Sequence, residues 1–553
     1  MLTPRDERSS ENLDAGRQLE QGQSGDIIHH KAISELFKLA PQRTHTLWRS
    51  FTDLTQIPRP SGHEQQVREY VKELARQHNW QVQVDKAGNI ALDLPGRGKG
   101  KNQKEGVILQ AHMDMVPAAS FINGVDETLD YFKNNPLKLL VAEEDYYQDG
   151  TAVPVLKAQG TSLGADDGIG VAAALAVALE AKDHPPLKLL FTVKEEIGLQ
   201  GAKELDPALI DDTAEVNFSK MISLDIGRSD GIRLGAAGGR DMIISLRPQR
   251  ETPPVGYVPV RLTVDGIESA DRHSGLDIHK PHVNPIQEAA RAVLFEIEAG
   301  SDIRLAGIVG GSSRNSIPRE CELVFFCKEA EKDRIVKEVT NQSRWHGLSS
   351  TIEPGIRVSL EEVQDLSKAL HQKPVNANDT VELLKFISEI PEGVQSWTAP
   401  LKGIKAPELS NNLGTVQTLA DRYGTIKLDL MSRSFDVALI DGLQKRIEVR
   451  VLRSGLSTEV EFVNAYGAWK PDAESDLFKV ARRLFTDMRG SAPEVIVQHS
   501  GLEAGVISGI KPGLEVIAIG PDIDGHHTPG ERVVISSVTE FQDLLNGILS
   551  KLC

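Results

Sequence analysis

The stretch Val107-Ile-Leu-Gln-Ala-His112-Met-Asp114-Met-Val-Pro117 decides the fold. The run from Val107 is apolar and contains no turn residue, which is typical of a buried strand in an α/β sheet. Side chains two positions apart on a strand point to the same face, so we expect His112 and Asp114 to emerge together. They would do so at the carboxyl end of the strand, where open α/β sheets place their functional sites. A histidine beside a carboxylate can ligate a metal, but it is also typical of a plain hydrogen-bonded pair, so further ligands must be sought elsewhere.

Length and composition limit the class of protein. A chain of 553 residues is too long for one hydrophobic core and should form two or more domains. The 62 basic and 79 acidic side chains give a net charge of −17, which argues against nucleic acid or an anionic membrane as a partner. Three cysteines cannot form a disulfide framework, the longest apolar run (Val171 to Leu179) is too short to span a bilayer, and the charged N-terminus lacks the apolar core of a signal peptide. We therefore expect a cytoplasmic protein.

The sequence pattern divides the chain into four segments. Residues 1–28 are polar without a repeating apolar pattern, so we expect a disordered tail. Alternating strand and helix patterns predict the first part of an α/β domain over residues 29–235 and its second part over residues 467–553. Between them, residues 236–466 are predicted to form an inserted α+β domain of two related units, because a similar order of elements recurs after Asp379.

Several local elements follow from turn and capping signals. Ser61-Gly-His-Glu64 has the spacing of a capping box and predicts that a helix follows it. Residues 81–85 and 90–94 are predicted to form a hairpin, and the acidic stretch from Pro117 to Gly160 is expected to be exposed loop. A further helix should run from Asn284, as its N-cap, to Gly300.

Acidic residues follow further predicted strands. The strand from Leu187 to Val193 is followed by Glu195 and Glu196, which would point to opposite faces of an extended segment and so take different roles. The strand that begins at Met221 ends on Asp225. Either acidic segment alone is also typical of a solvated turn or helix start. Acids at successive strand ends, with a histidine at the first, favour a shared site.

Two glycine-rich loops complete the candidate set. The loop Thr161 to Gly170 contains Asp166 and precedes an alanine-rich helix; its free N–H groups favour an anion, or the loop forms a plain helix cap. The loop after the apolar run Leu514 to Ile519 contains His526 and His527. Adjacent histidines in a Gly/Pro loop indicate either a surface turn or a metal ligand.

Together these groups suit a pair of metal ions. Two imidazoles and three carboxylates can hold two zinc-like ions, with one histidine and one terminal carboxylate on each ion and one carboxylate shared. Ions about 3.5–4 Å apart hold a bridging water, lower its pKa and polarise a carbonyl. Asp114 would then orient His112, and one glutamate would act as general base. The full set is His112, Asp114, Asp166, Glu195, Glu196, Asp225 and one of His526 and His527.

Seven segments of the chain, from about Leu47 to the C-terminus, resemble the M20 metallopeptidases. Within that family they are similar to the bacterial cytosolic aminoacyl-histidine (Xaa-His) dipeptidases, the peptidase D subgroup. The segments occur in the family's order: Ile57–Glu64, Gln110–Pro117, Leu163–Gly170, Glu195–Gly201, His273–Gly275, Arg314–Glu320 and the final His-Thr-Pro. Asp167, where the subgroup often has Asn, and Arg59, where a His is frequent, depart from the pattern.

The resemblance implies a role for each metal-site residue. Asp166 would bridge the two ions, with His112 and Asp225 completing one and Glu196 and His527 the other; His527 is chosen over His526 because the family pattern is His followed by Ser/Thr-Pro. Glu195 would be the general base, and Asp114 would orient His112. The expected metal is zinc, with manganese or cobalt as alternatives.

The resemblance also implies an overall architecture. We expect a zinc-peptidase-like catalytic α/β domain, with a mixed sheet flanked by helices, and an inserted domain that serves as lid and dimerisation surface in a homodimer. In that inserted domain His273 would assist in binding the substrate and its developing oxyanion, Asn315 would contact the substrate backbone, and Arg433 would bind the substrate carboxylate.

The function that the sequence favours is a two-metal dipeptidase for short peptides of the Xaa-His type. Glu195 would assist attack of a metal-activated water on the peptide carbonyl. One alternative is an M20-type deacylase of N-acyl amino acids, because the metal ligands do not distinguish the two reactions. A second alternative is a non-catalytic, metal-stabilised binding protein, which the presence of both Glu195 and Asp114 disfavours.

Overall fold

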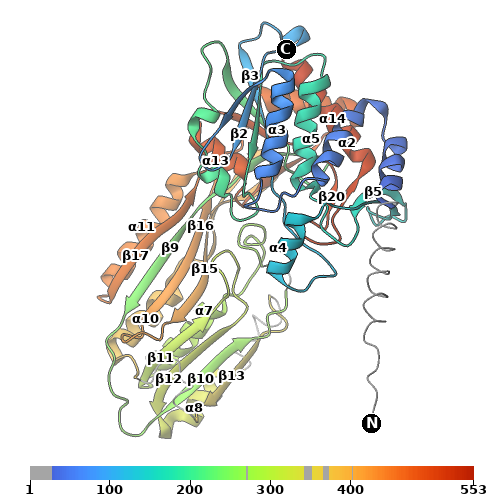
Figure 1. The fold of residues 1–553 in the computed structure, drawn as a ribbon. Coiled ribbons are helices and arrows are strands. Elements are labelled where there is room, and N and C mark those ends of the chain that lie inside the picture. Colours follow the sequence, from blue (N-terminus) through green and yellow to red (C-terminus); the bar gives the residue numbers. More distant parts are fainter. Residues whose placement is uncertain (1–27, 270–271, 342–351, 365–372, 402) are drawn as a thin grey trace, which may run out of the picture. The chain divides into compact units, whose positions relative to one another are not determined.

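The computed structural model describes residues 28–269, 272–341, 352–364, 373–401 and 403–553 (Figure 1). The tail expected over residues 1–28 lies outside the described residues except for its last position. The chain folds into two compact units. The first contains the chain up to Leu234, Asp472–Ile496 and Ile510–Cys553; the second contains Gly235–Pro471 and Val497–Gly509.

Two segments of this division differ from the expected one, which assigned all of residues 467–553 to the first unit. Residues 467–471 continue the second unit, and residues 497–509 also belong to it. The reason is hydrogen bonding within that unit: Ala237 N donates to Gln498 O at 3.0 Å, and Ser410 Oγ lies 2.8 Å from His499 Nε2. The chain therefore passes between the units more often than composition alone indicates.

The first unit is built on an eight-stranded mixed sheet with the order β1-β2-β6-β3-β7-β19-β8-β18, and a smaller sheet with the order β20-β21-β5-β4. Its strands are β1 (Gln81–Val84), β2 (Ile90–Leu94), β3 (Glu105–His112), β4 (Leu139–Glu144), β5 (Val153–Ala158), β6 (Leu187–Thr192), β7 (Asn217–Ser223), β8 (Gly231–Ala236), β18 (Glu494–Gln498), β19 (Glu515–Ala518), β20 (Ile523–Asp524) and β21 (Arg532–Val534). Its α-helices are α2 (His45–Thr55), α3 (Gln65–His78), α4 (Val125–Asn134), α5 (Ala165–Glu180), α6 (Gln200–Lys203), α12 (Asp476–Arg489) and α14 (Ile535–Lys551).

The central strands of the large sheet are parallel. β3 pairs in parallel with β6 on one side and β7 on the other, and β19 continues the parallel run beyond β7. β3 is buried from Gly106 to His112, as the apolar stretch predicts, and helix α5 packs against it. Because these strands run in the same direction, their carboxyl ends meet at one edge of the sheet.

Two local predictions in this unit are wrong. The stretch from Pro117 to Gly160 is not simply loop, because it also forms α4 and the β4–β5 hairpin, whose turn contains the exposed Asp145 and Tyr147. Helix α3 begins as expected, but Ser61 and Glu64 do not cap it: the Ser61 hydroxyl donates to Asp114 Oδ2, and Glu64 Oε1 accepts from Gly62 N and Lys194 N. Interactions with residues distant in sequence replace the local capping box.

The second unit contains a nine-stranded sheet with the order β13-β10-β12-β11-β15-β16-β9-β17 and β14 paired to β15. The strands are β9 (Gly238–Arg247), β10 (Tyr257–Asp265), β11 (Ile303–Gly310), β12 (Cys321–Lys328), β13 (Arg357–Glu362), β14 (Gly393–Leu401), β15 (Ile404–Thr418), β16 (Ile426–Ser434) and β17 (Ser457–Tyr466). The helices are α7 (Pro285–Glu298), α8 (Glu329–Val339), α10 (Ala377–Glu389), α11 (Val437–Arg453) and α13 (Glu503–Ile510).

The two halves of this sheet have the same order of elements. Along the chain, one half contains β10-α7-β11-β12-α8-β13 and the other contains β9-α10-β15-β16-α11-β17. If the four strands of each half are numbered along the chain, they lie side by side in the sheet in the order fourth, first, third, second in both halves. They join edge to edge where β11 pairs antiparallel with β15. Both halves contribute to one core of buried side chains, so they form a single sheet rather than two separate open-faced units.

The capping prediction for α7 is confirmed. The Asn284 side chain accepts from Ile286 N at 3.1 Å, and Pro285 occupies the first helical position. Asn284 Nδ2 also donates to Leu413 O, which ties this helix start to β15. In the described part of the chain, none of the helices has both the length and the apolar character that crossing a bilayer requires.

Candidate metal centre

The candidate ligands converge at the edge where the parallel strands end. His112 is the last residue of β3, Glu195 and Glu196 follow β6, and Asp225 follows β7. β6, β3 and β7 are neighbours in the sheet. Strand order therefore places side chains that are about a hundred residues apart in sequence at one site.

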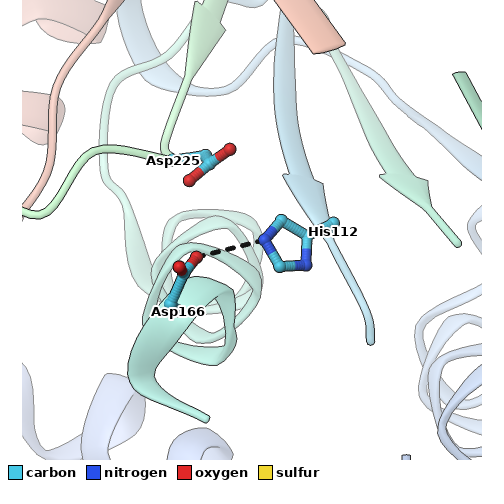
Figure 2. Close-up of side chains that lie close together, drawn as sticks. All are labelled: His112, Asp166 and Asp225. Atoms are coloured by element: carbon cyan, nitrogen blue, oxygen red, sulfur yellow. Dashed lines mark hydrogen bonds and ion pairs between the residues drawn. The ribbon is translucent and has the colours of Figure 1, made fainter. Parts of the chain in front are cut away.

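Asp166 reaches the same place from the start of helix α5. The glycine before it in the loop, Gly164, has φ 65°, and Asp166 itself has non-helical backbone angles. His112 Nε2 lies 3.1 Å from Asp166 Oδ1 (Figure 2). Asp167 interacts with the backbone instead, because its carboxylate accepts hydrogen bonds from His112 N and Gly170 N.

His527 lies on the connection between β20 and β21. Its Nε2 is 2.9 Å from Glu196 Oε2 and 3.6 Å from Asp166 Oδ2. Its backbone has φ 61°, a left-handed conformation that non-glycine residues seldom adopt and that is frequent at functional sites. His526 belongs to none of the ligand groups that the described residues form, and its ring lies beside Gly227.

Two groups with the geometry of a metal site share one aspartate. In each group the potential ligand atoms all lie within 4.8 Å of one another, and the groups are His112–Asp166–Asp225 and Asp166–Glu196–His527. Figure 2 shows the first group, with the Asp225 and Asp166 carboxylates and the His112 ring facing a common point. Glu195 lies in a third group, with His112 and Glu196, but in neither group that contains Asp166.

Asp114 organises the residues around it. This side chain is 0% exposed, and Oδ1 lies 3.6 Å from His112 Nδ1 while accepting from Glu195 N at 3.0 Å. Its other oxygen accepts from Ser61 Oγ at 2.7 Å and from Glu196 N at 3.3 Å. The backbone carbonyl of Asp114, 3.1 Å from His112 Nδ1, orients the histidine ring, and the carboxylate fixes the backbone that carries both glutamates.

The electrostatics of the metal-free site reflect crowded carboxylates. Hydrogen bonds with Asp166 and then Glu196 raise the pKa of His527 to about 10. Burial alone would lower the pKa of His112, but its hydrogen bonds with Asp114 and Asp166 outweigh burial and raise it. Burial and then the charge of Asp166 raise the pKa of Asp225 to about 6. Protonated imidazoles therefore partly neutralise these acids when no cation is present.

The donor set fits divalent cations of the zinc type. Imidazole nitrogen and carboxylate oxygen are ligands of zinc, and three or four of them per ion is the usual number. Glu196 Oε1 is buried and has no hydrogen-bond partner among the described residues, although its other oxygen contacts His527. A buried carboxylate oxygen without a partner is costly unless a cation or water occupies the position.

Sequence reasoning missed three residues that hold this site. Ser61 donates to Asp114, and the buried Arg59 donates to the carbonyls of Met113 and Asp114. The loop before α5 does bind an anion through its N–H groups, but the anion is the side chain of Glu531. None of the three residues is close in sequence to the groups that it contacts, so no local pattern identifies them.

The three expected substrate-binding residues all lie in the second unit. Ser274 N donates to the Asn315 carbonyl, so the loops that carry His273 and Asn315 are adjacent. Asn315 is exposed, and its Oδ1 accepts from Ser313 Oγ. Arg433 is buried and donates from Nη1 to the Tyr466 hydroxyl at 2.6 Å, and its charge contributes to a lowered pKa of His273.

Comparison with known proteins identifies the family. The sequence matches the model of peptidase family M20/M25/M40 over residues 108–551. The chain belongs to this family. The resemblance drawn from the sequence motifs is thereby confirmed.

Two relatives in the M20 family cover nearly the whole chain. The cytosol non-specific dipeptidase of Escherichia coli (strain K12) is 33% identical over 532 residues, which are 94% of this chain and 99% of that protein. The aminoacylhistidine dipeptidase from Vibrio alginolyticus superposes with a TM-score of 0.78 and 27% identity, covering 92% of this chain and 96% of that one.

A more distant solved structure has the same fold. The aminopeptidase PepT from Bacillus cereus superposes with a TM-score of 0.55 and 14% identity over 92% of this chain and 98% of that one. The expected M20 architecture, an α/β domain with an inserted α+β domain, is confirmed. The M20 chain described here is a peptide-bond hydrolase.

The protonated histidines predict that metal loading releases protons. The pKa of His527 is raised to about 10 and that of His112 is also raised, so both rings are protonated in the metal-free protein near neutral pH. A metal ligand must be the neutral imidazole, so binding of two ions near pH 7 should release more than one proton and should strengthen as the pH rises toward about 10, the pKa of His527. Calorimetric titration with zinc in two buffers of different ionisation enthalpy measures this release. Binding without proton release would contradict the assignment.

Proposed function

We propose that this protein is a two-metal dipeptidase that hydrolyses short peptides, with Xaa-His dipeptides as the preferred class. The observation that carries the proposal is the pair of ligand groups that share Asp166. The names of two relatives support dipeptides as substrates: one is a non-specific dipeptidase and the other an aminoacylhistidine dipeptidase.

The proposed ligands divide between the two ions. His112 and Asp225 would hold one ion, Glu196 and His527 the other, and Asp166 both. When bound, two such ions would supply a water of lowered pKa and would polarise the scissile carbonyl. Zinc is the expected metal, with manganese or cobalt as alternatives.

Glu195 is the proposed general base. It lies beside the ligand groups and is not a member of either Asp166 group, so its carboxylate is not required to hold an ion. Its backbone N–H is anchored on Asp114, which fixes the segment that carries it. Glu195 would take a proton from the attacking water and pass it to the leaving amine.

His273 is proposed to donate a hydrogen bond to the developing oxyanion. Gly275 N and Leu276 N both donate to His273 Nδ1, at 3.1 and 3.2 Å. Because Nδ1 accepts, the neutral ring carries its proton on Nε2. Burial and then the charge of Arg433 lower the pKa of His273, which keeps this tautomer neutral. The ring is therefore a preorganised donor.

Arg433 is proposed to bind the substrate carboxylate, and Asn315 is proposed to contact the substrate backbone. The Arg433 side chain is buried, and its Nε has no hydrogen-bond partner among the described residues. A buried guanidinium with an unpaired nitrogen is suited to a carboxylate, which it binds in a bidentate manner. The Asn315 side chain is exposed and has donor groups for a peptide backbone.

The remaining parts of the proposal concern location and assembly. We propose that the enzyme works in the cytoplasm, in keeping with the net charge of −17 and with three cysteines that are all free. We propose a homodimer in which the inserted unit supplies the dimerisation surface and serves as a lid. No nucleic acid or membrane partner is proposed.

A substrate panel tests the reaction class. With zinc, manganese or cobalt added, we expect turnover of β-Ala-His and Ala-His, with Ala-Ala as the control for specificity, and little turnover of N-acetyl amino acids. Equal cleavage of Ala-Ala would limit the proposal to a dipeptidase without Xaa-His preference. Cleavage of the N-acetyl amino acids alone would contradict the dipeptidase proposal and support a deacylase.

Substitution of each of the adjacent glutamates by glutamine distinguishes the proposed general base from the proposed metal ligand. Glu195→Gln should retain both ions and lose activity by about 100- to 10,000-fold, because only proton transfer is removed. The matched variant Glu196→Gln should instead lose affinity for metal. Metal content by elemental analysis and kcat are measured on the same samples. Full activity in Glu195→Gln would refute the assignment of the base.

Removing His273 should affect catalysis but not metal binding. His273→Ala deletes one oxyanion donor, so kcat should fall by about 100- to 1,000-fold. Metal stoichiometry should match that of the unmodified protein, because His273 lies in the second unit and the ligands in the first. An unchanged kcat, or loss of metal together with activity, would each contradict this role.

A further inference from the structure

The buried carboxylate of Glu531 accepts hydrogen bonds from consecutive backbone N–H groups. Oε2 accepts from Leu163 N at 2.8 Å and Gly164 N at 2.9 Å. Oε1 accepts from Ala165 N at 2.7 Å and Asp166 N at 3.2 Å. These amides form the turn that begins helix α5, and the side chain is 2% exposed. The last of the donors belongs to the aspartate shared by both ligand groups.

A buried arginine holds the same turn from its carbonyl side. Arg59 Nη2 donates to Gly164 O, and Nη1 donates to Met113 O at 3.0 Å and Asp114 O at 3.2 Å. A Cβ at Gly164 would lie 2.5 Å from Arg59 Nη2, so only glycine allows this approach. The turn before Asp166 is thus held by an anion on its N–H groups and a cation on its carbonyl.

Glu531 also belongs to the connection that carries His527. Within that connection Thr528 N donates to Gly525 O and Glu531 N donates to Thr528 O, so residues 525–531 form a compact turn. The Glu531 side chain therefore joins the turn of His527 to the turn of Asp166. His527 and Asp166 are two members of one ligand group. The contact links the two segments directly: Asp166 takes part in it through its backbone N–H, and His527 does not.

We infer that Glu531 is a positioning residue for the metal centre, which sets Asp166 and His527 at the separation that a cation requires. The inference rests on the ligand set proposed above. A carboxylate is suited to this task because both of its oxygens accept, whereas a glutamine amide would turn a donor toward two backbone donors. Residues that orient ligands in this way typically contribute about 10- to 100-fold to metal affinity.

Metal affinity tests the inference with the full-length protein. Zinc affinity is measured by competition with a chromophoric chelator for the unmodified protein, Glu531→Gln and Glu531→Asp, alongside the thermal melting of each metal-free protein. We expect Glu531→Gln to bind zinc about 10- to 100-fold more weakly, and to regain part of its peptidase activity when excess metal is added. Glu392→Gln is the matched control, because Glu392 also accepts a backbone N–H, from Leu413 in the second unit. It should bind zinc as the unmodified protein does.

The outcomes separate this role from general stability. Unchanged zinc affinity in a folded Glu531→Gln variant would overturn the inference while leaving the proposed metal centre intact. Should that variant fail to fold, Glu531→Asp decides, because it keeps the charge and both oxygens on a side chain one methylene shorter: weaker zinc binding supports the inference, and unchanged binding overturns it. Failure of the unmodified protein to bind two ions would refute the proposed metal centre itself.

Discussion

The structure of the site depends on the gathering of like charges around Asp166. Its carboxylate lies within reach of His112 and His527, and the acids Asp225 and Glu196 belong to the same ligand groups. Carboxylates brought together in a buried place repel one another and lose hydration, which costs free energy unless positive charge compensates. Much of the first unit can be understood as the framework that maintains this arrangement, with protons on the two imidazoles balancing the charge when no metal ion does.

The framework works through backbone contacts as much as through the strands. Parallel strands bring the ends of β3, β6 and β7 to one edge, but strand order alone does not fix side chains to within a fraction of an ångström. That accuracy comes from buried side chains that bond to the connecting segments. Asp114 accepts from the amides of Glu195 and Glu196, and Glu531 accepts from the turn of Asp166. Each carboxylate joins segments distant in sequence and so links the positions of the candidate ligands.

The sequence predicted what depends on local pattern and on motifs. The buried strand ending at His112, the hairpin after α3 and the Asn284 cap of α7 all arise from short-range rules, and the structure contains them. The candidate ligands were proposed from a histidine and acids that follow strands and from two glycine-rich loops, and the structure brings them together. The choice of His527 over His526 came from family resemblance, and the geometry places only His527 in a ligand group.

What the sequence could not supply are interactions between distant segments. Ser61 and Glu64 have the spacing of a capping box, yet each bonds elsewhere because Asp114 and Lys194 N offer better-placed partners once the sheet has formed. The N–H groups before α5 were expected to favour an anion, and they do bind one. That anion is the carboxylate of Glu531, which lies 365 positions from Asp166 in the sequence. The segment 497–509 looked like part of the first unit, but contacts with residues distant in sequence, among them its bonds to Ala237 and Ser410, place it in the second.

The pKa values of several histidines are shifted in opposite directions in the two units. In the first unit His112 and His527 face carboxylates, which raise the pKa of each ring and make it a site where a cation can replace a proton. In the second unit burial, together with the charge of Arg433, lowers the pKa of His273 and lowers that of His499 to about 3. Those rings stay neutral beside a buried cation, so they serve as hydrogen-bonding groups and leave the positive charge of Arg433 available to an anionic ligand. The first unit thus holds histidines whose protons compensate nearby carboxylates, whereas the second holds neutral histidines beside a buried guanidinium.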